Sequence, residues 1–315
     1  MARPVTGGDA SPAVSSAGAA DARPEVRAVV LLGGVLRPSR LSRSIGRALL
    51  DLPVGESQTM AEHWLEQCGA CFGGGSAGGP EVIIQLDSQS EQPRLGEAAR
   101  GLAVRVERDQ RAYRGTAGVL RDLAGGFGDD DLLLVAGATQ VLLEPLGEIV
   151  DALAGRPGLV SLLAHEDGTP SSISLLRCRA VNDLPEVGFV DLKEQVLPRL
   201  ATEHRVRVAS REVAAALPVR TRSSYIAALQ RLHQPGESGP FREDWQSCFS
   251  IIEPGSEVDS GARIHDSVVL SGGRVEAGAV VVRSVVCPGA VVGRNRTVVD
   301  AVVTPRGTEG GKASE

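Results

Sequence analysis

The residues of this sequence best suited to binding an anion are two glycine turns and the arginines that follow the first of them. The apolar run 28–32 ends at Gly33-Gly34, and Arg37, Arg40 and Arg47 follow it. Backbone N–H groups of a tight turn, together with guanidinium groups, bind phosphate well. These residues therefore predict a phosphate site after the first strand, with a basic helix face exposed to water as the alternative.

A second glycine turn, Gly115-Thr116-Ala117-Gly118, opens a predicted helix. Its backbone could admit a nucleotide base at close range, or the turn could serve only to pack the helix closely. Lysine is scarce, because Lys193 and Lys312 are the two lysines among 33 basic residues. Neither lysine follows a glycine-rich turn, so the charge beside a phosphate would have to come from arginine.

Short apolar runs alternate with helical patterns along the first two thirds of the chain. This alternation predicts an α/β domain with a Rossmann-like, mixed but mostly parallel sheet that helices cover on both faces. Ligands of such sheets bind beyond the carboxyl ends of the strands, where the Gly33 turn, the Gly115 turn and residues 136–138 fall. Strands are expected at 28–32, 81–86, 102–106, 131–135, 158–164 and 172–176, and helices at 56–68, from 115, at 144–154, 191–201 and 222–233.

An apolar residue recurs every six positions near the end of the sequence. Such a period predicts a short left-handed parallel β-helix of about three coils, each made of three repeats with the apolar residue pointing inward. The series is Ile252, Val258, Ile264, Leu270 and, after one step of five, Val275, Val281 and Cys287.

The composition shifts divide the chain into five parts. We expect a disordered segment at 1–25, an α/β domain at 26–234, a linker at 235–250, the hexapeptide coils at 251–304 and a disordered tail at 305–315.

Composition excludes several classes of partner. A net charge of −6 and 3% aromatic residues argue against nucleic acid. No run approaches the roughly 18 apolar residues of a membrane span. The five cysteines have no regular spacing, and the first residues lack a secretory core, so we expect a cytoplasmic protein. The Cys68/Cys71 pair is interpreted as the end of a helix, with a redox or zinc role as the alternative.

These features, in this order, resemble the sugar-1-phosphate nucleotidyltransferases, above all the mannose-1-phosphate guanylyltransferases and glucose-1-phosphate pyrophosphorylases. The matching segments are 31–34, 115–118, 190–194 with Leu197-Pro198, and 221–225, followed by the coils. The resemblance implies that a nucleoside triphosphate loses pyrophosphate to a sugar 1-phosphate. It also implies a nucleotide site, here degenerate, at Leu32, Gly33, Gly34, Arg37, Arg40, Arg47, Gly115, Thr116, Ala117 and Gly118.

The sequence departs from the family where the family does its chemistry. Val35 follows Gly33-Gly34 where a third glycine is usual, and Arg47-Ala48 replaces a Lys-Pro pair. Ala138 and Pro218 stand where two carboxylates would hold Mg²⁺. The sugar-binding stretch after His165 is shortened. We therefore expect no metal site and no catalytic residue, and predict a catalytically inactive protein with a nucleotide-binding, regulatory or assembly role.

Three alternatives remain open at this point. The first is an active pyrophosphorylase in which arginines hold the phosphates and Mg²⁺ is required. The second is an acyltransferase that uses His265 as its base, and the third is a scaffold that binds no nucleotide. Asp129–Asp131 precede a strand and are interpreted as a capping turn. The expected partners are a nucleotide or nucleotide sugar, and a second copy or an active homologue bound through the coils.

Overall fold

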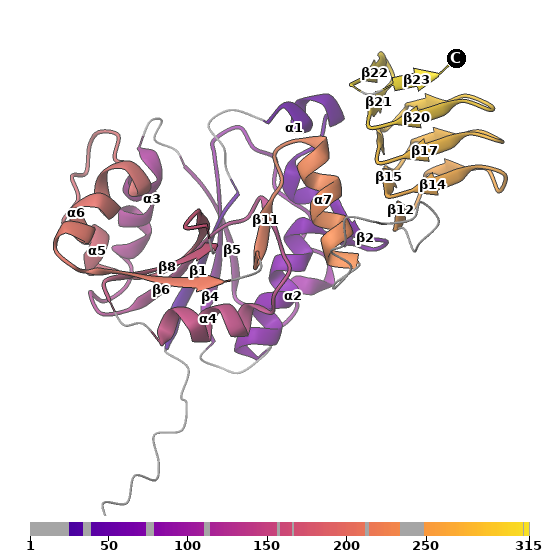
Figure 1. Cartoon of the computed structure of the whole chain (residues 1–315). Helices are drawn as coiled ribbons and strands as arrows, with labels where there is room; N and C mark the ends of the chain where they lie inside the picture. The colour runs from indigo at the N-terminus through magenta and orange to yellow at the C-terminus, as the bar shows by residue number, and fades with distance from the viewer. Residues whose placement is uncertain are drawn as a thin grey trace, which may run out of the picture.

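The computed structural model describes residues 25–33, 39–73, 79–109, 114–155, 158–165, 167–211, 214–233, 249–310 and 312–314. An α/β domain is followed by a column of short stacked strands that lies beside α7 (Figure 1). No helix within these ranges is long and apolar enough to cross a membrane.

The α/β domain is built on one seven-stranded sheet of order β10-β8-β9-β6-β1-β4-β5. β1 pairs in parallel with β4 and β6, whereas β9 runs antiparallel between β6 and β8. The sheet is therefore mixed and mostly parallel, as predicted. Its strands are β1 (Val26–Leu32), β4 (Glu81–Leu86), β5 (Val104–Arg108), β6 (Leu132–Gly137), β8 (Val160–His165), β9 (Pro170–Arg177) and β10 (Val206–Arg211).

Helices cover both faces of this sheet (Figure 1). Val29 and Leu31 of β1 face the core that contains Trp64 of α2, and Ala28 and Val30 face the core that contains Leu120 of α3. This two-sided burial explains the continuous apolar runs of the central strands. The helices of the first face are α2 (Met60–Phe72), α4 (Leu146–Ala154) and α7 (Arg222–His233), and those of the second are α3 (Gly115–Ala124), α5 (Arg179–Asn182) and α6 (Leu197–Thr202).

The predicted helix at 191–201 is divided into two elements. A π turn, η3 (Leu192–Val196), comes first, and α6 begins at Leu197 with Pro198 in its first turn. Proline has no N–H and is accommodated at a helix start, which explains the break.

Several short elements surround the sheet. β7 follows the end of β6 in the chain and pairs antiparallel with β11. These elements are α1 (Arg40–Ile45), η1 (Leu49–Asp51), β2 (Pro53–Gly55), β3 (Gln58–Thr59), η2 (Glu97–Ala99), β7 (Gln140–Leu142) and β11 (Ala216–Pro218).

The C-terminal strands stack in three parallel sheets, which confirms the predicted hexapeptide β-helix. Ile252 pairs with Val269 and Val285 pairs with Val302, so a coil takes 17 residues rather than three full repeats of six. The strands are β12 (Ser250–Ile252), β13 (Glu257–Val258), β14 (Arg263–His265), β15 (Ser267–Val269), β16 (Arg274–Val275), β17 (Val280–Val282), β18 (Val285–Val286), β19 (Val291–Val292), β20 (Thr297–Val299) and β21 (Val302–Thr304).

The inward position differs from the prediction in the first coil. Val281 and Cys287 are buried as expected, but Ile252 is 39% exposed while its neighbour Ile251 is buried. Ile252 pairs in register with Val269, which is fully buried, so the difference is a property of the first coil and not of the register.

The predicted disordered tail also differs from the structure. Within 305–315, β22 (Gly307–Glu309) and β23 (Lys312–Ser314) turn back and pair antiparallel with β21 and β20. Residues 1–24 and 234–248, which hold most of the predicted N-terminal segment and linker, lie outside the described residues.

Buried serine hydroxyls link successive coils. The Ser284 hydroxyl donates to the Val282 carbonyl at 2.7 Å and accepts from the Ala301 N–H at 3.0 Å. The Ser284 N–H in turn donates to the Ser267 hydroxyl at 3.0 Å. Because Ser267 and Ser284 are fully buried, no water can replace these bonds.

We expect Ser284→Ala to lower the free energy of unfolding by about 1–3 kcal/mol, because it leaves the Ala301 N–H without its acceptor in the interior of the coils. Urea unfolding monitored by circular dichroism measures this loss. Thr308→Ala, on exposed β22, is the matched control and should change stability by less than about 0.5 kcal/mol. Equal effects of the two substitutions would show that the serine bonds add nothing.

Candidate functional site

The carboxyl end of β1 lies between the ends of β4 and β6. The Gly33 N–H donates to the Gln85 carbonyl at 2.9 Å, and the Ala138 N–H donates to the Leu32 carbonyl at 3.0 Å. A Cβ atom at Gly33 would lie 2.6 Å from the end of the Leu50 side chain, so a larger residue here would require Leu50 to move. Gly34 and Arg37, also predicted here, lie outside the described residues.

The Gly115 turn is fastened to the segment that precedes η3. Gly115 has φ +69°, and a Cβ atom there would lie 2.3 Å from the Val190 carbonyl oxygen. That carbonyl accepts from the Ala117 N–H at 3.1 Å, while the Val190 N–H donates to the Arg114 carbonyl at 2.9 Å. Glycine at 115 is therefore required both by the left-handed backbone and by the close approach.

The Thr116 side chain continues this connection. Its hydroxyl donates to the Asp191 carboxylate at 3.1 Å and accepts from the Leu192 N–H at 3.1 Å. Asp191 also caps the π turn by accepting from the N–H groups of Lys193 and Glu194. These bonds support the packing interpretation of the Gly115–Gly118 turn, because two of its polar groups already have protein partners.

Lys193 lies at the end of β6, a position that sequence reasoning missed. Its Nζ donates to the Ser172 hydroxyl at 3.3 Å. A Cβ atom at Gly137 would lie 3.1 Å from the Cβ of Ser172, so the ammonium group is beside the last residue of β6. One feature of the sequence pointed to Lys193, its place in the matching segment 190–194. Its position in space depends on the antiparallel β9, which brings Ser172 to this edge.

Ala138 and Pro218, the two positions where the resemblance implies metal carboxylates, lie near each other, Ala138 between β6 and β7 and Pro218 at the end of β11. Pro218 of β11 pairs with Gln140 of β7, and the Val219 N–H donates to the Thr139 carbonyl at 2.9 Å. Ala138, one residue earlier, is buried. A methyl group and a proline ring offer no oxygen to a cation. Within the described ranges no three His, Cys, Asp or Glu side chains gather as a metal site.

Helix α2 holds this part of the chain in place. The Trp64 indole N–H donates to the carbonyls of Ala138 and Gln140 at 3.1 and 3.0 Å. His63 Nε2 lies 3.1 Å from the Leu142 carbonyl oxygen. Burial lowers the pKa of His63, so the ring is neutral near pH 7 and has a structural role.

Of the two predicted arginines that the structure describes, one is paired with the coils and the other is exposed. Arg47 forms an ion pair with Glu253 of the coils at 2.7 Å, and Arg40 is the exposed first residue of α1. Asp131 accepts from the Gly128 N–H at 2.8 Å just before β6 begins, which agrees with the predicted capping turn.

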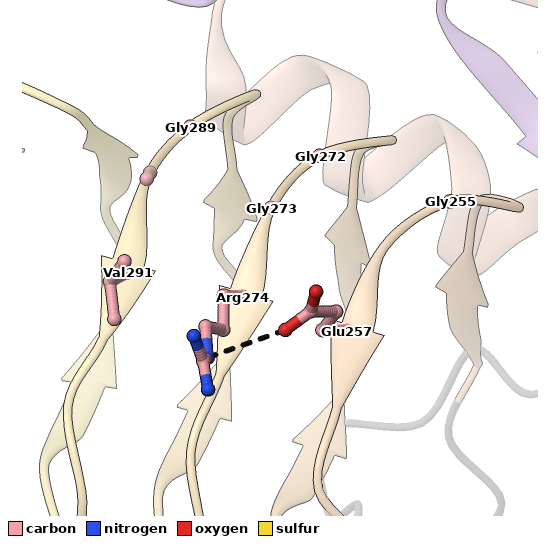
Figure 2. A pocket seen from close by; sticks show the side chains of 8 residues that line it. Gly255, Glu257, Gly272, Gly273, Arg274, Gly289 and Val291 are labelled. Atoms are coloured by element: carbon pink, nitrogen blue, oxygen red, sulfur yellow. Dashed lines mark ion pairs between the residues drawn. The ribbon is translucent and has the colours of Figure 1, made fainter.

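A shallow groove crosses the coil face formed by β13, β16 and β19 (Figure 2). Arg274 and Glu257 form an ion pair within it, with Arg274 Nε 3.4 Å from Glu257 Oε2. His265 belongs to β14, in a different sheet, and does not line this groove. The geometry therefore gives no support to a histidine base acting there.

Comparisons with known proteins agree with the coils and the fold. Residues 242–308 match the family model described as GlmU-like, C-terminal hexapeptide. No curated protein matches the sequence. A Bacillus anthracis structure described as a glucose-1-phosphate thymidylyltransferase in complex with a sucrose has a TM-score of 0.50 at 12% identity, covering 69% of this chain and 97% of that one.

A second solved structure, HddC from Yersinia pseudotuberculosis, has a TM-score of 0.49 at 11% identity and covers 65% of this chain and 99% of that chain. The Bacillus anthracis structure and the hexapeptide match confirm the predicted fold: an α/β domain like that of the sugar-1-phosphate nucleotidyltransferases, followed by hexapeptide coils.

We expect Gly115→Ala to destabilise the protein by about 1–3 kcal/mol, because alanine is strained at this φ and its Cβ meets the Val190 carbonyl. Thermal unfolding followed by calorimetry measures the change. Gly125→Ala, at the other end of α3, is the control, since its φ is −59° and its Cβ would have a nearest neighbour at 3.5 Å. A Gly115→Ala protein as stable as the Gly125→Ala protein would contradict the required turn.

Proposed function

We propose that this protein binds a nucleotide or nucleotide sugar at the sheet edge beside Gly33, Gly115 and the end of β6, and does not catalyse nucleotidyl transfer. Its role is then regulation or assembly, together with a second copy or an active homologue that contacts the coils. The observation that carries this proposal is the pair Ala138 and Pro218, at the positions where the resemblance requires two carboxylates: Ala138 lies two residues before Gln140, the residue that pairs with Pro218.

Nucleotidyl transfer requires compensation of negative charge. Transfer of a nucleotidyl group from a triphosphate builds negative charge on the phosphate oxygens and on the leaving pyrophosphate, and catalysis depends on neutralising that charge. Mg²⁺ requires hard oxygen ligands in near-octahedral geometry. With an alkyl side chain at both positions, the protein offers the metal no anchor there.

Binding of a nucleotide without catalysis requires fewer charged groups and no metal ion. One ammonium group and the exposed backbone at a strand end can hold a phosphate or diphosphate group. Lys193 supplies that ammonium beside Gly137, at the edge where ligands of α/β sheets bind.

The same lysine supports a second candidate function, an active pyrophosphorylase with a rearranged site. In that case a nucleoside triphosphate and a sugar 1-phosphate would give a nucleotide sugar and pyrophosphate, with Mg²⁺ held by other groups. The two functions differ in one measurable product. Pyrophosphate release from GTP or UTP with mannose 1-phosphate or glucose 1-phosphate, in Mg²⁺, should stay at background for the inactive protein.

We expect Lys193→Ala to weaken binding of GDP-mannose or UDP-glucose about tenfold or more, because a hydrogen bond to a charged group contributes roughly 1.5–3 kcal/mol. Isothermal titration calorimetry measures the dissociation constants. Arg199→Ala removes an equal charge from exposed α6 and should leave affinity unchanged. The binding proposal fails if the wild-type protein binds neither nucleotide sugar at millimolar concentration.

A further inference from the structure

Helix α1, which follows the Gly33 turn in the chain, is attached to the coils. The Ser44 hydroxyl donates to the Glu309 carboxylate of β22. The Ser44 carbonyl faces the Cys287 thiol, and α1 packs against β21. The segment Arg40–Arg47 therefore rests on the C-terminal strands, although it belongs to the α/β domain by sequence.

A single ion pair anchors the end of this segment. Arg47 Nη1 lies 2.7 Å from Glu253 Oε1, and the two side chains are only 16% and 13% exposed. The other oxygen of Glu253 accepts from the Ser271 N–H at 2.8 Å. Both oxygens of this carboxylate thus have partners, one in each part of the protein. Removing one member of such a shielded pair leaves a poorly solvated charge and costs far more than breaking an exposed pair.

We infer that the Arg47–Glu253 pair makes the coils a positioning element for the candidate site, because it fixes the chain at Arg47, three residues before Leu50, whose side chain lies against Gly33. Arg47 is then a positioning residue, and its charge is already neutralised by Glu253. The link to ligand affinity rests on the proposed nucleotide binding at this edge. By thermodynamic reciprocity, a ligand that needs Arg40–Arg47 in this position also favours attachment of the coils.

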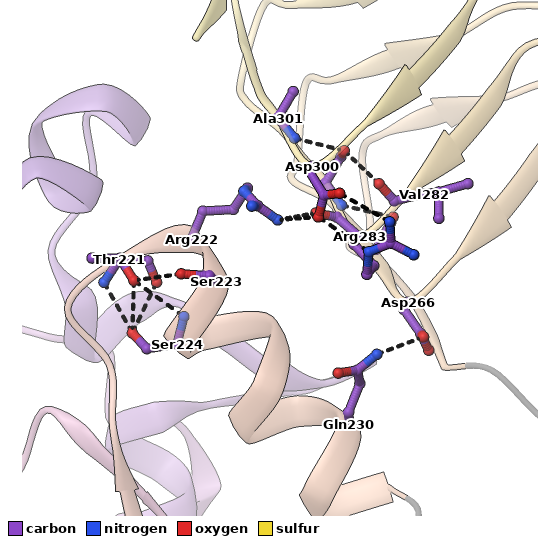
Figure 3. Close-up of polar contacts among 12 residues, drawn as sticks. Thr221, Arg222, Ser223, Ser224, Gln230, Asp266, Val282, Arg283, Asp300 and Ala301 are labelled. Atoms are coloured by element: carbon purple, nitrogen blue, oxygen red, sulfur yellow. Dashed lines mark hydrogen bonds and ion pairs between the residues drawn. The ribbon is translucent and has the colours of Figure 1, made fainter. Parts of the chain in front are cut away.

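A second polar contact between the two parts provides the matched control (Figure 3). Asp300 accepts from Arg222 of α7 at 3.1 Å and from Arg283 at 2.9 Å. This contact fastens α7 rather than α1, and the side chains of Asp300 and Arg283 are 42% and 44% exposed. Its loss should loosen the boundary between the two parts without releasing Arg40–Arg47.

The test compares Glu253→Gln with Asp300→Asn in the full chain. Hydrogen exchange followed by mass spectrometry reports on the amides of residues 40–46. We expect exchange there to become about five- to tenfold faster in Glu253→Gln, because local opening is easier without the pair, and to stay unchanged in Asp300→Asn. Equal exchange in the two variants would overturn the inference.

A double-mutant cycle keeps the test independent of general destabilisation. If Arg47 and Glu253 act as a pair, Arg47→Gln combined with Glu253→Gln should speed exchange less than the product of the two single effects. Multiplicative effects would contradict the pairing.

Titration with GDP-mannose and UDP-glucose completes the experiment. We expect several-fold weaker binding by Glu253→Gln and wild-type binding by Asp300→Asn; equal weakening in both variants would contradict a positioning role. Should the wild-type protein bind neither nucleotide sugar, the proposed function fails, while the exchange comparison still decides whether the pair holds the segment.

Discussion

Backbone pairing at the end of β6 is the constraint on which the chemistry of this protein depends. The Ala138 N–H bonds to Leu32 on one side, and the Thr139 carbonyl accepts from Val219 on the other. These two bonds bring together strands that are far apart in sequence and fix which side chains meet at the ligand edge. The side chains of Ala138 and Pro218, which these bonds bring near each other, carry no oxygen or nitrogen atom that could bind a cation.

Much of the fold could be predicted because burial on both faces makes the central strands continuously apolar. Residues 28–32 of β1 and the strand Leu132–Gly137 are such runs, and Gly33 and Gly137 mark their ends. The strand Val206–Arg211 was missed, since it is an edge strand that alternates valine with arginine and serine and is largely exposed on both faces. A search for apolar runs cannot find a strand that buries so few of its side chains.

The candidate site was less predictable than the fold. Its side chains are brought together by the pairing of distant strands, which the local sequence pattern does not reveal. Lys193 sits in a segment that looks helical, and only the antiparallel course of β9 brings its partner Ser172 beside Gly137. Arg47 shows the opposite case. Its place in the sequence suggests a phosphate ligand, yet its nearest anion is Glu253, more than two hundred residues later. The position of an arginine shortly after a glycine turn therefore does not tell whether its charge is available to a ligand or already forms an ion pair within the protein.

The serine bonds inside the coils limit how this part of the protein can change in length. Ser267 and Ser284 align because successive coils are in the same register, so inserting one residue within a coil would shift every later hydroxyl away from its acceptor. Lengthening or shortening the column should therefore be tolerated only as whole 17-residue turns, gained or lost by duplication or deletion of a complete coil.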